Sequence, residues 1–361
     1  MIATRTLTDG GQQPVEIART VAEFLAAAEH SLDLALYDIN LGPETETIVL
    51  GAIEAAAQRG VAVRLAFNAD FHAPIPVPPP PKARPEDIAR LSVPTRAIPG
   101  IPDLMHHKFV VRDGAAVWSG STNWTDDSWS REENVIVTVD SPDVAQSFTL
   151  AFEELWQKAD VMQSGFVEPR PVEVDGREVR AWFCPGFGDA LAHRVAKMLG
   201  KARRRIRICS PVLTSGPILG TLCQIAAEGK IDLAGCVDQT QIEEVLYQWR
   251  TNGVSAWKIP LLQTVLTRAA FSGKRSTPYT PTSVHDYMHA KVTVADDVVF
   301  CGSLNLSRSG ERNAENMLEI HDAGLADQLA TFVDGVRARY PAASLPAADM
   351  TRGQAPGPGR N

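Results

Sequence analysis

Two histidine–lysine pairs dominate the chemistry that this sequence could support. His106 stands two residues before Lys108, and His289 stands two residues before Lys291. A neutral imidazole can attack phosphorus, and an imidazolium can protonate a leaving oxygen. Lysine ammonium groups can stabilise non-bridging phosphate oxygens, as Mg²⁺ does elsewhere. Two such pairs without a carboxylate cluster therefore indicate phosphoryl transfer without a metal.

The two pairs belong to a longer internal repeat. "MHHKFVVRDGAAVWSGSTNW" aligns with "MHAKVTVADDVVFCGSLNL", and an aspartate lies seven residues after each histidine, at Asp113 and Asp296. A Gly-Ser-x-Asn group and a Glu-Asn pair also recur. The residues of these groups are Gly120, Ser121, Asn123, Glu133 and Asn134 in the first copy and Gly302, Ser303, Asn305, Glu315 and Asn316 in the second. So many matched offsets indicate duplication of a whole functional site.

The period of a β-strand assigns faces to the neighbouring histidines. Side chains two residues apart lie on one face of a strand and the residue between them lies on the other. His106 is therefore expected to share a face with Lys108, whereas His107 points away and receives no role. Asp113 and Asp296, at strand ends near turns, are expected to form structural hydrogen bonds, and Gly120 and Gly302 are read as structural parts of the motif.

Each polar residue of the repeat has an expected role. Glu133 and Glu315 are predicted to orient the imidazoles as carboxylate partners. The side chains of Ser121, Ser303, Asn123 and Asn305 offer hydrogen-bond donors to phosphate oxygens. Zinc is disfavoured because lysines beside the histidines repel a cation. We expect no metal and no cofactor.

The elements that must position these residues also occur twice. Each half is predicted to begin with a strand–helix–strand unit, to continue with three strands that carry the motif, and to end with an amphipathic helix. The predicted elements are 31–39, 44–60, 61–70, 107–111, 115–121, 133–139 and 141–159 in the first half, and 204–213, 218–229, 231–238, 289–294, 297–303, 315–320 and 323–340 in the second. The pattern predicts an α/β fold of two duplicated halves, related by a pseudo-two-fold, with mixed sheets flanked by helices.

The motif H-x-K-x(4)-D followed by G-S-x-N, present twice, resembles the phospholipase D superfamily over about residues 20–340. The resemblance implies one active site at the interface of two similar halves, a covalent phosphohistidine intermediate and no metal. It further implies that His106 is the nucleophile and His289 the acid and base. The residues that it assigns to phosphate binding are Lys108, Lys291, Asn123 and Asn305.

The predicted organisation is a first half at 1–160, a linker at 161–178, a second half at 179–340 and a disordered tail at 341–361. The proline-rich segment 74–102 is expected to form a stiff, extended loop at the site entrance. A basic loop at 255–286 is expected to attract phosphate through side chains assigned to substrate binding, namely Arg268, Lys274 and Arg275.

Composition limits the partners. The chain has 361 residues and a net charge of −8, which disfavours non-specific binding to nucleic acid. No apolar run suggests a signal peptide or a membrane span, so a cytoplasmic monomer with at most peripheral membrane contact is expected. The five cysteines are expected to be reduced, and most of them buried.

The substrate is the point at which the sequence leaves alternatives open. The favoured function is hydrolysis of a phospholipid phosphodiester, or transfer of its phosphatidyl group. The first alternative is a metal-independent endonuclease acting on DNA or RNA, and the second is a binding protein with a vestigial site.

Overall fold

The computed structural model describes residues 1–71, 88–100, 102–280 and 283–345, and its first half is built on a mixed sheet. The strands of this sheet are β1 (Ile2–Leu7), β2 (Ser31–Leu36), β4 (Ala62–Phe71), β5 (Thr95–Gly100), β6 (Lys108–Arg112), β7 (Ala116–Gly120) and β9 (Asn134–Asp140). Their order is β1-β9-β7-β6-β2-β4-β5. The strands β2, β4 and β5 run parallel, and the remaining pairs are antiparallel. A short parallel pair, β3 (Ile39–Asn40) with β8 (Trp124–Thr125), lies apart from it.

The second half repeats this sheet. Its strands are β10 (Val172–Val174), β11 (Arg177–Cys184), β12 (Arg205–Cys209), β13 (Asp232–Asp238), β14 (Ala270–Lys274), β15 (Val292–Ala295), β16 (Val298–Gly302) and β17 (Glu315–His321). They follow the order β10-β11-β17-β16-β15-β12-β13-β14, in which every strand from β11 onward has a counterpart in the first sheet. The predicted duplicated α/β fold is therefore confirmed. It also extends further than predicted, because the N-terminal strand β1 corresponds to β11.

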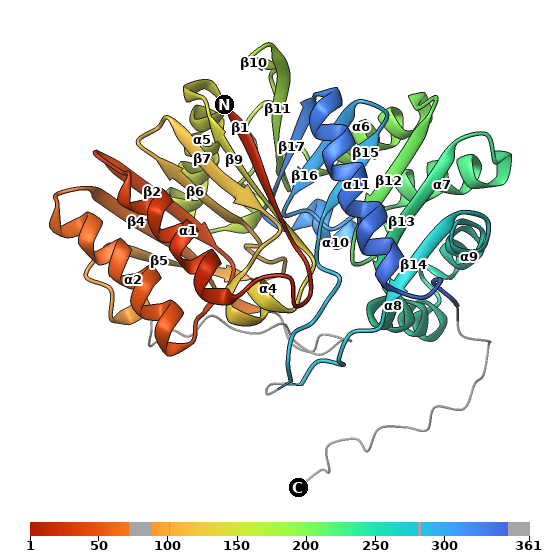
Figure 1. Cartoon of the computed structure of the whole chain (residues 1–361), viewed down its shortest axis with the longest axis horizontal. Coiled ribbons are helices and arrows are strands. Elements are labelled where there is room, and N and C mark those ends of the chain that lie inside the picture. The colour runs from red at the N-terminus through yellow and green to blue at the C-terminus, as the bar shows by residue number, and fades with distance from the viewer. Residues whose placement is uncertain (72–87, 101, 281–282, 346–361) are drawn as a thin grey trace, which may run out of the picture.

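Helices cover both sheets (Figure 1). They are α1 (Pro14–Ala26), α2 (Pro43–Gln58), α4 (Asp126–Ser130), α5 (Pro142–Lys158), η1 (Val161–Gln163), α6 (Gly188–Lys201), α7 (Gly216–Glu228), α8 (Gln239–Asn252), η2 (Ala256–Lys258), α9 (Ile259–Arg268), α10 (Arg308–Arg312) and α11 (Ala323–Arg339). The helices α1 and α2 lie on the outer side of the first sheet, and α6, α7 and α9 lie on the outer side of the second.

The helices α5 and α11 join the two halves into one core. The Ser141 side chain caps the first turn of α5, and the Asp322 side chain caps that of α11. Apolar residues at helical spacing on both helices then pack in one buried cluster with residues from both sheets, including Val137 of β9 and Val294 of β15. The ends of β6, β7, β15 and β16 are thereby fixed relative to one another, which is what a site shared between the halves requires.

Several segments differ from the sequence-based expectation. Residues 255–286 are not one basic loop, since they contain η2, α9 and β14 before the chain reaches a loop at 275. The predicted linker 161–178 contains η1 and the edge strand β10. The first tail residues pack on the second sheet, where Ala343 N donates to Phe271 O at 2.9 Å. Of the proline-rich segment, 74–87 and 101 lie outside the described residues, and 95–100 forms the edge strand β5.

Candidate active site

The two motif histidines are held by backbone contacts with the opposite half. His106 N donates to Ala314 O at 2.9 Å, and His289 N donates to Glu133 O at 3.2 Å. Each histidine therefore enters its strand beside the segment that leads into β17 or β9 of the other half. Both imidazoles are buried, and the charges of both motif lysines act on each of them. The structure thus brings the two distant motifs into a single site.

His106 is paired with a carboxylate. Its Nδ1 atom lies 2.7 Å from Oε1 of Glu315, which is fully buried. The Tyr37 ring packs edge-on against the imidazole, with a centroid separation of 4.7 Å. These contacts fix the ring so that Nε2 is the nitrogen left for chemistry.

His289 has a different pair of neighbours. Its Nδ1 atom lies 3.2 Å from Oδ1 of Asn134 and 3.3 Å from Oε2 of Glu132. Asn134 and Ser128 both donate to the Glu132 carboxylate, at 3.0 and 2.8 Å. Neither Glu132 nor Asn134 was predicted to contact an imidazole.

The expected role of Glu133 is wrong, and a difference in loop length explains why. Ser121 N donates to Val135 O, fourteen residues on, whereas Ser303 N donates to Asn316 O, thirteen residues on. The first half therefore has one extra residue before its last strand, so that Asn134, not Glu133, occupies the place of Glu315. At this position the first half has the amide of Asn134, whereas the second half has the carboxylate of Glu315.

Glu133 instead points away from the imidazole. Its carboxylate accepts hydrogen bonds from Lys274 Nζ at 2.9 Å and from the Tyr340 hydroxyl. Lys274 also donates to Arg131 O at 2.8 Å and forms an ion pair with Asp9. Lys274 is 3% exposed, so this side chain is a structural link between the halves and not a phosphate-binding group.

The other two predicted substrate-binding cations are also placed away from the chemistry. Arg275 forms a two-point ion pair with Glu243 on α8. Arg268 ends α9, directly before β14, whereas the site lies beyond the opposite end of that strand. The structure therefore contradicts the basic-loop assignment.

The motif lysines are arranged alike. Lys108 Nζ donates to His106 O, and Lys291 Nζ donates to His289 O, both at 2.6 Å. Lys108 also lies over the Tyr37 ring, 4.7 Å from its centroid. Both ammonium groups are buried, and each carries three N–H donors, of which the histidine carbonyl takes one.

Burial dominates the electrostatics of the site. It lowers the pKa of Lys108 to about 7 and that of Lys291 well below the ordinary lysine value. Burial, reinforced by the lysine charges, holds the pKa of His106 and His289 well below 6.5. Burial also raises the pKa of Glu315 to about 8 and that of Glu132 to about 7. Burial thus favours the neutral forms of these lysine, histidine and glutamate side chains near neutral pH.

The motif aspartates have the predicted structural role. The carboxylate of Asp113 accepts from the backbone N–H groups of residues 29–31, and that of Asp296 accepts from those of residues 203–205. Partial burial opposes ionisation, but these bonds prevail and lower the pKa of both carboxyls. Both aspartates have a left-handed backbone, with φ of 56° and 52°.

The motif glycines and serines hold in place the backbone and side chains around the site. A Cβ at Gly120 would lie 2.1 Å from Val135 O, and one at Gly302 would lie 2.3 Å from Asn316 O. Ser121 Oγ donates to Asn134 Oδ1 at 2.6 Å, and Ser303 Oγ accepts from Asn316 N at 3.0 Å. Because both serines are buried and so engaged, they position the residues beside the imidazoles and do not bind substrate directly.

The side chains of Asn123 and Asn305 remain available to bind a ligand. Each is partly exposed, and the buried Oδ1 atom of each has no hydrogen-bond partner among the described residues. Since Oδ1 only accepts hydrogen bonds, the groups of these amides that could bind a phosphate oxygen are their Nδ2–H donors. His107, by contrast, is buried against Phe109 with its Nδ1 atom 3.1 Å from Asn316 Nδ2, on the face away from Glu315 as predicted.

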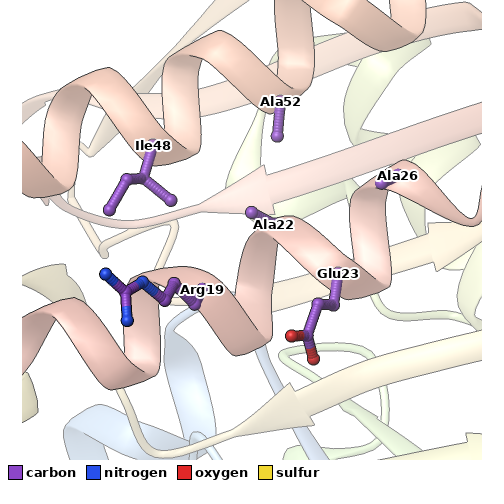
Figure 2. Close-up of a pocket in the computed structure, with 6 residues that line it drawn as sticks. All are labelled: Arg19, Ala22, Glu23, Ala26, Ile48 and Ala52. Carbon is purple, nitrogen blue, oxygen red and sulfur yellow. The ribbon is translucent and has the colours of Figure 1, made fainter.

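A surface groove between α1 and α2 lies apart from this chemistry. It is lined by Arg19, Ala22, Glu23, Ala26, Ile48 and Ala52 (Figure 2). None of the motif residues lines this shallow groove. Within the described part of the chain, no helix has the length and apolar character needed to span a bilayer.

Comparisons with known proteins agree with the geometry. A family model described as "Cardiolipin synthase, PLD-like domain" matches residues 21–156 and 195–336. The human protein named mitochondrial cardiolipin hydrolase is 29% identical over 175 residues, covering 44% of this chain and 61% of that protein. Its Xenopus laevis namesake is 42% identical over 57 residues, covering 16% of this chain and 27% of that protein. The chain thus spans less than two thirds of these relatives.

A solved structure supports the fold. The phosphatidylserine synthase of Haemophilus influenzae superposes with a TM-score of 0.63 at 12% identity, covering 93% of this chain and 86% of that one. Both halves of the chain are matched by the family model, and both contribute a histidine and a lysine to the same site. The chain belongs to the phospholipase D-like family.

Proposed function

We propose that this protein is a metal-independent phosphodiesterase that cleaves a phospholipid phosphodiester through a phosphohistidine at His106. The observation that carries the proposal is the convergence of both histidine–lysine pairs on one buried site, with Nδ1 of His106 on the Glu315 carboxylate. Both pairs lie in one chain, so the reaction requires no second copy.

In the first step, Nε2 of neutral His106 attacks phosphorus, and the bond from phosphorus to the leaving oxygen breaks. The His289 imidazolium transfers a proton to that oxygen. The depressed pKa of His106 keeps its lone pair free. Burial raises the pKa of Glu315 to about 8, so the step uses the ionised fraction of Glu315, which grows as the pH rises. In that form the carboxylate accepts the Nδ1–H and stabilises the positive charge that develops on the ring.

In the second step, neutral His289 removes a proton from water or from an acceptor alcohol. The oxygen attacks phosphorus, the phosphorus–nitrogen bond breaks, and its electron pair returns to His106. With water the reaction is hydrolysis, and with an alcohol it is phosphatidyl transfer.

The phosphate oxygens are held by Lys108, Lys291, Asn123 and Asn305. A phosphodiester brings a negative charge next to these buried groups, so its binding raises the pKa of both lysines and of His289. Substrate binding thereby favours the protonated, positively charged forms of the groups that stabilise the transition state. The lysines take the place of a metal in this scheme.

Two observations favour a phospholipid over a nucleic acid. The curated relatives carry the name cardiolipin hydrolase. In addition, Lys274 and Arg275 are paired with Glu133 and Glu243, and the net charge is −8, so a track for several successive phosphates is not supported by these cations.

The test is a substrate panel in excess EDTA. Phosphatidylcholine, phosphatidylglycerol, cardiolipin, single- and double-stranded DNA, RNA and bis-(p-nitrophenyl) phosphate are incubated with the wild type and with His106→Ala. We expect cleavage of at least one phospholipid and of the nitrophenyl ester by the wild type alone. Cleavage of nucleic acid without lipid would support an endonuclease instead, and no cleavage of any diester would support a vestigial site.

A further inference from the structure

In each half, a buried side chain near the end of a strand holds the residue that precedes the motif histidine. In the first half, Asn68 Oδ1 on β4 accepts a hydrogen bond from Met105 N at 3.0 Å. In the second half, Asp238 Oδ2 on β13 accepts one from Met288 N at the same distance. All four residues are buried, so water does not compete for these bonds. The backbone that leads into each histidine is therefore tied to the sheet of its own half.

The two side chains occupy equivalent positions of the duplicated sheets. The strands β4 and β13 hold the same place in the two strand orders. Asn68 lies five residues after Val63, and Asp238 lies five residues after Leu233. Through β2 or β12, Val63 and Leu233 each align with the sixth residue after the motif histidine of their half. The same contact is therefore present in both copies, made by an amide in one and by a carboxylate in the other.

Each motif histidine is thereby held from two directions. The N–H of the histidine donates to a backbone carbonyl of the opposite half. The N–H one residue earlier donates to Asn68 or Asp238 of the same half. Two successive peptide groups with partners in different halves fix where each imidazole lies relative to the other. Because a misplacement of about 1 Å can cost ~10²-fold in rate, these contacts can matter for catalysis without touching substrate.

The carboxylate of Asp238 uses both of its oxygens. Oδ1 accepts from Gln241 N at 3.0 Å, which caps the first turn of α8, and from Ser276 Oγ at 2.8 Å. Oδ2 accepts from Met288 N. Burial raises the pKa of Asp238 to about 6, so the carboxylate is mostly ionised at pH 7 and above, where both oxygens can accept. The cap and the contact with the histidine segment are thus separate functions of two atoms.

We propose that Asn68 and Asp238 are positioning residues with different kinetic effects, Asn68 for the nucleophile His106 and Asp238 for the acid and base His289. The inference rests on the proposed function, which gives the two histidines different roles. Loss of the Asp238 contact should weaken proton transfer to the leaving oxygen. Loss of the Asn68 contact should weaken the attack on phosphorus itself.

The experiment measures the rate of phosphohistidine formation in a single turnover, with an alkaline quench, on two phosphatidyl esters. Phosphatidylglycerol has a leaving group that needs a proton, whereas phosphatidyl-p-nitrophenol needs little protonation. Asp238→Ser keeps an oxygen that can cap α8 but lacks the second oxygen that accepts from Met288 N. It should slow the glycerol ester by about 10²-fold and the nitrophenyl ester by less than about threefold. Asn68→Ala should slow both esters alike.

Ser276→Ala is the matched control. It removes a hydrogen bond from the same carboxylate but leaves the bond from Met288 N in place, so it should react as wild type with both esters. Amide hydrogen exchange, resolved by NMR, tests the contacts without any reaction. Exchange at Met288 should become faster in Asp238→Ser while exchange at Met105 does not, and Asn68→Ala should show the reverse.

The outcomes separate this inference from the proposed function. Equal slowing of both esters by Asp238→Ser, or unchanged rates with both, would overturn the positioning role while the wild type still forms phosphohistidine. Unchanged exchange at Met288 in Asp238→Ser would also overturn it. A wild type that forms no phosphohistidine from either ester would overturn the proposed function itself.

Discussion

Nδ1 of His106 lies 2.7 Å from Oε1 of Glu315, a residue 209 positions later in the chain. His289 has an amide in the equivalent place, since its Nδ1 faces Oδ1 of Asn134 at 3.2 Å with Glu132 at 3.3 Å. The two halves are therefore duplicated in fold but unequal in the groups that touch their imidazoles. That inequality suits two histidines with different roles.

The first prediction contrasts two adjacent glutamates. Glu132→Gln removes the carboxylate beside His289, so kcat should fall by about tenfold or more while the fold is kept. Glu133→Gln leaves the imidazole contacts in place but takes a charged partner from buried Lys274, which should cost about 3 kcal/mol of unfolding free energy. Steady-state kinetics and thermal unfolding of both variants check this. The register would be wrong if Glu133→Gln reduced kcat more than Glu132→Gln did.

The second prediction concerns the two neighbouring histidines. His106→Ala should lose several orders of magnitude in kcat because the nucleophile is absent. His107→Ala should retain kcat within about tenfold but lower the melting temperature, because His107 is buried against Phe109 and bonded to Asn316. The comparison is made on bis-(p-nitrophenyl) phosphate. The reverse ranking of the two activities would contradict the assignment.

The third prediction assigns the covalent intermediate. On a diester with an activated leaving group, which needs little protonation, His289→Ala should still form a phosphohistidine and then accumulate it. The adduct should appear at residue 106 when the protein is quenched in an alkaline denaturant, which preserves the acid-labile phosphorus–nitrogen bond, and is then digested and analysed by mass spectrometry. His106→Ala is the control and should form none. An adduct at His289 in Glu315→Gln or in the wild type would exchange the two roles.

The fourth prediction follows from the depressed lysine pKa. At pH 8, Lys108, with a pKa of about 7, is mostly neutral in the free protein. A bound anion favours the charged form and raises that pKa, so binding must take protons up from the buffer. Titration calorimetry with sulfate, in buffers of different ionisation enthalpy, should give a positive proton uptake that is reduced in Lys108→Met. A binding enthalpy independent of the buffer would contradict it.

The fifth prediction concerns the cations once expected to capture phosphate. Arg268 is exposed at the end of α9, and Arg275 is exposed and paired with Glu243, so alanine at either position should change KM by less than about twofold. Lys274→Ala should instead destabilise the protein, because Glu133 would be left buried without its partner. A tenfold rise in KM for Arg268→Ala would contradict this prediction and indicate that Arg268 binds substrate.

Residue patterns within single segments of the sequence were enough to predict much of the fold and part of the site. The alternation of strand side chains was enough to place His106 with Lys108 and to turn His107 away. The repeat predicted the duplicated sheets and their helices, and it identified both motif aspartates as structural residues. These inferences depend on residues near one another in the chain, where backbone geometry fixes the relation between side chains.

The partners of the imidazoles were decided only by the tertiary structure. Matched offsets predicted Glu133, but one extra residue in the first half shifts Asn134 into its place, and in a strand a shift of one residue reverses the face. The burial of Lys274 likewise depends on Asp9, Glu133 and Tyr340, which come from distant parts of the chain. Such contacts depend on how the two sheets pack, and a periodic pattern within one segment carries no information about them.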